Sequence, residues 1–574
     1  IAEVRDRSVL LESQTELAGI EGVTVLIHDQ ECAAEKRRKR KRGQIEDPPQ
    51  RVYINERVCE GCGDCGKKSS CLSVLPVETE FGRKTEIHQS SCNKDYSCLE
   101  GDCPSFLTVI PAKPRRARAA GVPLPAVELR DPPRIVGQDE FTMRMIGIGG
   151  TGVVTVSQVI GVAALIDGLH VAELDQTGLS QKGGPVTSDL RISRKPLAGS
   201  NRVSAAGADL YLGFDDLGAS NLKNLAVADP DRTVAVVSTA AVPTGTMVVD
   251  ASRIFPEVDD QIQAIDSVTR SDANVYLDAQ RLAESVLGDH MPGNMVALGA
   301  AWQRGALPLS FGAVEEAIRL NGAAVEMNLA AFAWGRACVA SPDAVAEAVR
   351  EPEPERAPLS DAALDLIDSV AGDGELRRLL EVRVPELIEY QSRAYAEEYV
   401  GFVRGVLERS GSHPIAEAVA RQLYYLMAFK DEYEVARLHL AALPSEGKFW
   451  FHLHPPLLRA LGLKRKLKLG RWFVPAFRML RAMRRLRGTW LDPFGRPEVR
   501  RVERELIGEY RALVTRAVAH LRPETAPLVL EICDLPDEIR GYEEIKLRSV
   551  KRFRMTAERL ERKLARAAAL EAAA

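Results

Sequence analysis

Apolar positions in the middle third of the chain follow two different periods. The apolar run at residues 141–146 precedes a glycine-rich turn, and residues 153–166 then carry apolar side chains at helical spacing. Further apolar segments predict strands and one helix at His170–Leu174, Asp209–Phe214, Thr233–Ser238 and Glu315–Leu320. Because strands that alternate with helices are typical of α/β domains, residues 138–350 are predicted to form one, with a mostly parallel sheet.

The last third of the chain has a purely helical pattern. Residues 359–574 are rich in Leu, Ala, Arg and Glu, and apolar residues recur at intervals of three and four, as in residues 416–429 and 558–574. This pattern predicts an all-helical C-terminal domain. The Pro- and Glu-rich residues 351–358 read as the linker before it.

The part of the chain before the α/β domain divides into three segments. Residues 1–45 hold a helix-like stretch, the apolar run Val23–Ile27 and the basic run Glu35–Gly43, which is typical of a solvated tail or a helix end. We predict Val23–Ile27 to be a buried strand, although little precedes it that could complete a sheet. Residues 46–112 are dense in cysteine, and residues 113–137 read as a linker. We therefore expect a fragment of a longer protein; a short N-terminal extension is the alternative.

Composition narrows the class of protein. The 574 residues correspond to roughly four domains of about 150 residues. The chain has 76 Lys and Arg residues and 80 Asp and Glu residues, which gives a net charge of −4. It therefore lacks the overall positive charge expected of a protein that binds nucleic acid along its whole surface. The sequence contains no run of about eighteen apolar residues, so no membrane-spanning helix is predicted. The N-terminus is too charged for a secretory signal, so we expect a cytoplasmic protein.

Seven of the ten cysteines fall between Cys59 and Cys103. Cys59, Cys62 and Cys65 are each separated by a two-residue spacer, which lets three thiolates wrap one face of a cubane. The fourth ligand in bacterial two-cluster ferredoxins is a distant cysteine followed by proline, as Cys103 is here. We predict that these four cysteines hold a 4Fe-4S cluster.

Cys71, Cys92 and Cys98 supply three further thiols. A second cluster would need a ligand such as Asp95, or would be a three-iron form. Structural zinc and disulfides are the competing readings, but the second group lacks a cysteine pair with a two-residue spacer, and no secretory signal points to an oxidising compartment. Cys32, Cys338 and Cys533 stand alone in apolar surroundings and are predicted to be core residues.

Two glycine-rich loops are candidate cofactor-binding segments. The first contains Gly147, Gly149, Gly150 and Gly152, and the spacing of three of these matches the dinucleotide fingerprint. Asp175 follows Gly152 at about the separation where this fingerprint places an acid that binds a ribose. The second loop could cradle a phosphate, line an interface or be a plain turn; it comprises Ser180, Gln181, Lys182, Gly183 and Gly184.

These segments together resemble a known family. The cysteine segment, residues 59–106, resembles the ferredoxin-like part of fused, single-chain indolepyruvate ferredoxin oxidoreductases. The two glycine-rich loops and residues 291–336 are similar to the gamma domain of 2-oxoacid:ferredoxin oxidoreductases. The C-terminal helical segments look like the extension of the fused form, so the resemblance covers nearly the whole chain.

The resemblance implies an activity. It implies oxidative decarboxylation of an aryl-pyruvate to an acyl-coenzyme A, with ferredoxin as electron acceptor. It implies thiamine diphosphate and Mg in two N-terminal domains that are absent here, of which residues 1–45 would be the closing strand and tail. It further implies a Rossmann-like gamma domain without a nicotinamide site, and we expect a homodimer. An NAD(P)- or flavin-linked iron–sulfur oxidoreductase that uses Gly147–Gly152 is the alternative.

Overall fold

The computed structural model describes residues 3–112, 122–178, 183–250, 252–350, 358–370, 374–454 and 465–572. The chain divides into two compact units, one of residues 1–48 with 93–95 and the other of residues 49–92 with 96–574. No helix in the described ranges has the length and apolar composition that crossing a membrane requires.

The first unit is small, and the regular elements among its described residues are all helical. It contains η1 (Arg7–Val9), α1 (Leu10–Ala18) and α2 (Ala33–Lys41). The basic run is therefore a helix, and its cationic last turn suits the negative end of the helix dipole. The strand predicted at Val23–Ile27 is wrong: the segment lies in no helix or strand, and Val23 is 97% exposed. Cys32 is also exposed rather than in a core.

A cysteine module, residues 49–92 and 96–112, opens the second unit. Its elements are β1 (Arg51–Ile54), α3 (Asp64–Ser69), β2 (Val74–Thr79), β3 (Gly82–Ile87), η2 (Ser97–Glu100) and β4 (Phe106–Ile110). Strands β2 and β3 form a hairpin, and β1 pairs antiparallel with β4. The iron–sulfur module was predicted as ferredoxin-like, and that likeness stays a prediction.

The C-terminal region is not all-helical, which corrects the sequence prediction. Strands β11 (Lys448–Leu453) and β12 (Leu467–Gly470) extend the sheet of the cysteine module in the order β1-β4-β11-β12. Phe449 and Phe451 alternate inward from β11 into a small core with Leu107 and Val109. A strand as short as β11 does not stand out among long helical repeats, and its pairing partner β4 lies in a distant part of the sequence.

The α/β domain is built on a six-stranded sheet of order β10-β9-β8-β5-β7-β6. Its strands are β5 (Glu140–Ile148), β6 (His170–Thr177), β7 (Pro185–Ser193), β8 (Leu210–Gly213), β9 (Val234–Ser238) and β10 (Val275–Leu277). The pairings from β10 to β5 are parallel, and those of β7 with β5 and β6 are antiparallel. The prediction of a mostly parallel sheet is thus confirmed, with two reversed pairings at one edge.

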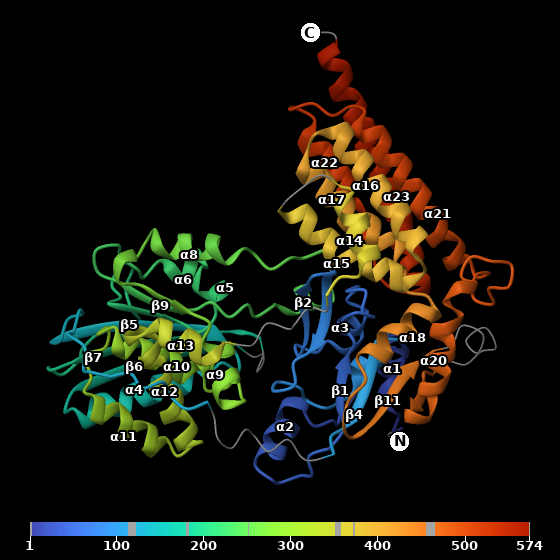
Figure 1. The fold of residues 1–574 in the computed structure, drawn as a ribbon. Coiled ribbons are helices and arrows are strands. Elements are labelled where there is room, and N and C mark those ends of the chain that lie inside the picture. Colours follow the sequence, from blue (N-terminus) through green and yellow to red (C-terminus); the bar gives the residue numbers. More distant parts are fainter. Residues whose placement is uncertain are drawn as a thin grey trace. The chain divides into compact units, whose positions relative to one another are not determined.

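Helices cover both faces of this sheet (Figure 1). One face packs against α4 (Val153–Ile166), α9 (Ala279–Leu287), α10 (Gly293–Gln303), α11 (Phe311–Asn321), α12 (Val325–Ala340) and α13 (Pro342–Val349). The other face packs against α5 (Asp216–Ala219), α6 (Leu222–Leu225) and α8 (Val258–Asp266). The short turn η3 (Ser271–Ala273) contributes Ala273 to the core on the first face. Burial on both faces explains why β8 and β9 are continuous apolar runs instead of alternating ones.

The predicted linker of residues 113–137 is partly packed. Residues 113–121 lie outside the described ranges, but Val122, Leu129, Ile135 and Val136 pack against the α/β core. Ile135 donates its N–H to the carbonyl of Gly305 at 3.0 Å. Residues 351–357 of the second linker also lie outside the described ranges.

The helical region begins at Leu359. It contains α14 (Asp361–Asp368), α15 (Glu375–Tyr390), α16 (Arg393–Ser410), α17 (His413–Met427), α18 (Glu432–Ala441), η4 (Arg471–Phe473), α20 (Val474–Ala482), η5 (Met483–Leu486), α21 (Glu498–Val518), α22 (Ala526–Asp534), η6 (Leu535–Glu538) and α23 (Glu543–Ala572). Leu376, Leu379, Leu380, Val384 and Leu387 of α15 lie on one stripe of the helix and enter a large shared core. The periodicity read from the sequence therefore identified the buried faces correctly.

A buried ion pair joins β5 to β7 and generates a stability prediction. Arg144 and Asp189 are register partners, and the guanidinium donates to the carboxylate at 2.6 and 2.7 Å. Asp189→Ala leaves the Arg144 cation buried without its partner, so we expect a loss of about 3–5 kcal/mol. Hydrogen exchange of β5 and β7, followed by mass spectrometry, measures the loss.

The matched control is Asp139→Ala, because the Asp139 side chain is 93% exposed and forms only a loose pair with Arg194 at 3.4 Å. Its effect should stay within about 0.5 kcal/mol. Equal protection of β5 and β7 in the two variants would contradict a role of the Arg144–Asp189 pair in holding these strands together.

Candidate functional site

The loop that carries Cys59, Cys62 and Cys65 leaves the end of β1. Its start is a tight turn in which the Asn55 carbonyl accepts the N–H groups of Val58 and Cys59. Gly61 then donates its N–H to the Cys59 sulfur at 3.3 Å, the type of amide–sulfur contact that cluster-binding loops use. Gly61 has a φ of +61°, a conformation that favours glycine. The loop leads directly into α3.

Strand pairing brings Cys103 to this loop from the far end of the module. Ile54 is the register partner of Phe106, and Asn55 donates its N–H to the Ser105 carbonyl at 2.8 Å. Because the strands are antiparallel, the segment after β1 and the segment before β4 meet at the same end of the sheet. The four cysteines predicted to bind the first cluster consequently line a single pocket: Cys59, Cys62, Cys65 and Cys103.

These thiols lie in an enclosed pocket, which Glu60, Asp64 and Asp102 also line. Burial raises the pKa of the Cys62 thiol to about 12, and burial together with neighbouring thiols raises the pKa of Cys65 and Cys103. Buried thiols therefore stay neutral unless positive charge inside the pocket favours the thiolates, as iron would. In the ranges described, no three His, Cys, Asp or Glu side chains are already arranged as a metal site. The fit of these residues to a cluster therefore rests on two observations: all four donors are thiols, and all four line one pocket.

Two lysines lie close to the thiols, and sequence reasoning missed both. Lys466 donates to the Gly101 carbonyl, and its ammonium lies 4.5 Å from the ring centre of Phe106. Lys84 is buried on β3, and burial together with the Lys430 ammonium lowers the pKa of Lys84 to about 7. Lysines beside buried thiols favour the negative charge of a thiolate-bound cluster. No sequence signal marks them, because each belongs to a different part of the chain.

A segment of the α/β domain covers α3. Helix α7 (Gly245–Val249) packs so closely that a Cβ added at Gly66 would lie 2.6 Å from the Val248 carbonyl oxygen. Val248 also belongs to the apolar cluster that contains Cys65 and Cys98. The cysteine module and the α/β domain therefore share a packed contact.

Cys71, Cys92 and Cys98 do not line the pocket of the other four cysteines. They belong to the apolar cluster around Val74 and Ile87, which also contains Cys65 and Cys103 of that pocket. Cys98 is buried on η2. Asp95, the candidate non-cysteine ligand, is assigned to the first compact unit. The structure thus separates the seven cysteines into a convergent set of four and a neighbouring set of three.

The glycine-rich loops of the α/β domain are bonded to each other. Gly149 donates its N–H to the Gly184 carbonyl at 2.6 Å, and Gly183 donates to the Gly149 carbonyl at 3.1 Å. Asn294 lies against Gly152 at the start of α4, and the Cβ side of Gly150 is open. The amide of Gly149 is therefore already used inside the protein. Ser180, Gln181 and Lys182 lie outside the described residues.

The sheet order also argues against a dinucleotide site. A ribose-binding acid follows the strand next to the glycine turn. Asp175 instead lies on the edge strand β6, paired with Ser188, and the reversed strand β7 separates β6 from β5. The NAD(P)- or flavin-linked alternative is consequently not favoured.

Two protein-family models match parts of the chain. The family model for pyruvate ferredoxin/flavodoxin oxidoreductase matches residues 142–338, which run from β5 into α12. A second model, for a family of unknown function named DUF6537, matches residues 376–559 of the helical region.

Individual relatives cover about a third of the chain. An indolepyruvate oxidoreductase subunit IorB from Archaeoglobus fulgidus is 28% identical over 195 residues, which are 33% of this chain and 91% of that protein. The subunit of the same name from Pyrococcus horikoshii is 29% identical over 199 residues, 34% of this chain and 94% of its own length. A solved gamma subunit of keto/oxoacid ferredoxin oxidoreductase from Geobacter sulfurreducens covers 35% of this chain and 98% of its own, at 20% identity and a TM-score of 0.25.

The matched oxidoreductase model lies within the α/β domain. The similar curated proteins are also oxidoreductase subunits. Residues 142–338 are therefore similar to the 2-oxoacid:ferredoxin oxidoreductase family.

Proposed function

We propose that this chain forms the electron-transfer and gamma-domain part of an indolepyruvate (aryl-pyruvate) ferredoxin oxidoreductase. The observation that carries the proposal is the convergence of Cys59, Cys62, Cys65 and Cys103 on one buried pocket, in a chain that also holds the oxidoreductase domain. In the proposed reaction the bond between the carboxylate and the 2-oxo carbon breaks, and a thioester to coenzyme A forms. Carbon dioxide and one proton leave, and two electrons pass singly to two ferredoxins.

In this proposal the four convergent cysteines are the ligands of a 4Fe-4S cluster, which takes up and releases single electrons. The Gly61 amide that donates to the Cys59 sulfur stabilises the reduced, more negative state. The Lys466 and Lys84 ammonium groups favour that state electrostatically, since the pocket is shielded from water.

The remaining cofactors are assigned by analogy with the family. Thiamine diphosphate with Mg supplies the carbanion-stabilising chemistry of the complete enzyme, and coenzyme A accepts the acyl group. We propose ferredoxin as the redox partner of a cytoplasmic homodimer. The glycine loops stay the predicted cofactor contact, and the open side of Gly150 is the point at which a ligand has room to approach.

A second cluster is proposed on Cys71, Cys92 and Cys98, completed by a ligand other than cysteine or formed as a three-iron centre. Its support is that all three thiols share one apolar cluster, to which Cys65 and Cys103 of the first site also belong.

Anaerobic purification tests the first cluster. We expect labile sulfide and iron in equal amounts, and a loss of about four iron atoms per chain in Cys59→Ser or Cys103→Ser, because one ligand is removed from a four-ligand site. Iron and sulfide analysis, with electron paramagnetic resonance of the reduced protein, measures this.

Cys338→Ser is the matched control, because Cys338 lies on α12 of the α/β domain, away from the cysteine module. It should retain all the iron of the parent chain. Stoichiometric zinc without labile sulfide in the parent chain would contradict the proposal.

Cys71→Ser and Cys92→Ser test the second cluster separately. We expect each to lose about three or four iron atoms while the resonance of the first cluster remains, because neither residue lines the first pocket. Iron content equal to that of the parent chain in both variants would remove the second cluster and leave the first intact.

A further inference from the structure

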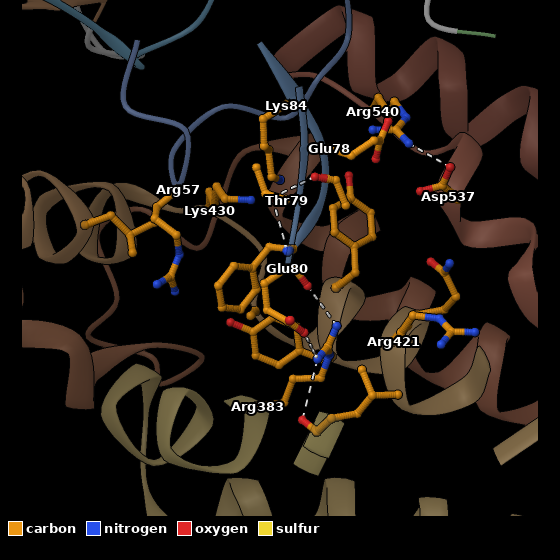
Figure 2. Close-up of a pocket in the computed structure, with 18 of the residues that line it drawn as sticks. Arg57, Glu78, Thr79, Glu80, Lys84, Arg383, Arg421, Lys430, Asp537 and Arg540 are labelled. Atoms are coloured by element: carbon orange, nitrogen blue, oxygen red, sulfur yellow. Dashed lines mark hydrogen bonds and ion pairs between the residues drawn. The ribbon is translucent and has the colours of Figure 1, made fainter. Parts of the chain in front are cut away.

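A charged cavity lies between the cysteine module and the helical region, about 600 Å³ in volume. Its roof is the tip of the β2–β3 hairpin, and its walls come from α15, α17 and the segment around η6 (Figure 2). This volume is typical of a pocket for a small molecule. Phe81, Tyr424, Leu379 and Leu438 supply apolar surface.

Basic side chains dominate the cavity. Seven lining residues are cationic: Arg57, Lys84, Arg378, Arg383, Arg421, Lys430 and Arg540. Five are acidic: Glu78, Glu80, Glu375, Glu434 and Asp537. The lining therefore has a formal excess of two positive charges.

Most of these charges are matched inside the protein. Glu80 pairs with Arg378 and Arg383, Glu375 pairs with Arg378, and Asp537 pairs with Arg540. Residues outside the lining complete three more pairs: Glu60 with Lys430, Glu386 with Arg57 and Arg437 with Glu434. Within the part of the chain that the structure describes, Lys84 and Arg421 have no carboxylate at ion-pair distance.

Lys84 is the more deeply buried of the two cations without a carboxylate partner. It is only 2% exposed, and none of the described residues accepts a hydrogen bond from its ammonium. The Lys430 and Arg540 cations lie near enough to repel it, while the Glu60 carboxylate attracts it from beyond ion-pair distance. Figure 2 shows Lys84 and Lys430 close together under the hairpin. A buried ammonium without an acceptor is unfavourable, so it either loses its proton or is compensated by a bound anion.

Arg383 provides a second, independent donor without an acceptor. Its side chain is buried on α15, and its Nε has no hydrogen-bond partner even though its two other nitrogens are bonded. Two donors on different elements, a β-strand and a helix, thus line one cavity with unused hydrogen-bonding capacity.

We infer that this cavity binds the phosphate group of a small phosphorylated molecule. A tetrahedral dianion accepts hydrogen bonds from several directions, which suits donors that come from β3, α15 and α17. The basic side chains of the lining suit an anion, and the aromatic and aliphatic walls suit an organic body attached to it. None of the seven clustered cysteines lines this cavity, although Lys84 lies near both the cavity and the thiols of the proposed cluster.

Isothermal titration calorimetry of the full chain tests the inference, with pyrophosphate, ADP and adenosine as probes at low ionic strength. We expect pyrophosphate and ADP to bind and adenosine not to bind. Tighter binding of ADP than of pyrophosphate indicates an organic phosphate, and the reverse order indicates an inorganic one. No binding of either phosphate would overturn the site.

Variants locate the binding. Arg421→Met and Lys84→Met should each weaken binding about tenfold or more, because each removes a charge-assisted contact. Arg421 has no ion-pair partner among the described residues, so its removal should leave the fold intact even if Lys84→Met disturbs the module. Arg552→Met, an exposed helical position on α23, is the control and should bind as the parent does. Unchanged affinity in Arg421→Met, with cluster content normal, would contradict the assignment.

Discussion

The antiparallel pairing of β1 with β4 is the contact on which the cysteine site depends. It ties the residues just after Ile54 to those just before Phe106, and so places Cys103 beside the loop of Cys59, Cys62 and Cys65. A one-residue slip would turn every side chain of β4 to the opposite face. Burial of Val52, Phe106 and Leu107 opposes such a slip. The packing that fixes the register of the sheet therefore also brings the thiols together.

The same sheet makes the helical region part of the module. Strand β11 pairs with β4, and buried charges reinforce the contact. Glu60, between Cys59 and Gly61, is buried; although desolvation opposes its charge, the cations Lys430, Lys546 and Lys84 hold the pKa of its carboxyl at about 2. Two of these three cations come from the helical region, on the chain after α17 and on α23. The loop of the proposed cluster is therefore held by residues near the other end of the chain as well as by its neighbours.

The α/β domain shows how topology changes the meaning of a motif. The glycine turn follows β5 and precedes α4, as in a dinucleotide fold. The reversed strand β7 then inserts between β5 and β6, and the second glycine loop, at the start of β7, uses the amide of Gly149. The motif is present, but the strand that would supply the ribose acid is displaced by one position in the sheet.

Local features were readable from the sequence alone. The apolar periods predicted α4 at its observed bounds, the strands β5, β8 and β9, and the buried stripes of the helical region. The cysteine spacing singled out the four thiols that converge. These features depend on residues that are close together in the sequence, where the spacing of apolar residues indicates which positions are buried. The tertiary structure alone decided the rest: that Val23–Ile27 forms no strand, that β11 and β12 join the cysteine module, and that Lys84 and Arg383 line a shared cavity. Strand partners and buried charges are chosen by hydrogen bonds and packing between residues far apart in the sequence, and no local pattern encodes that choice.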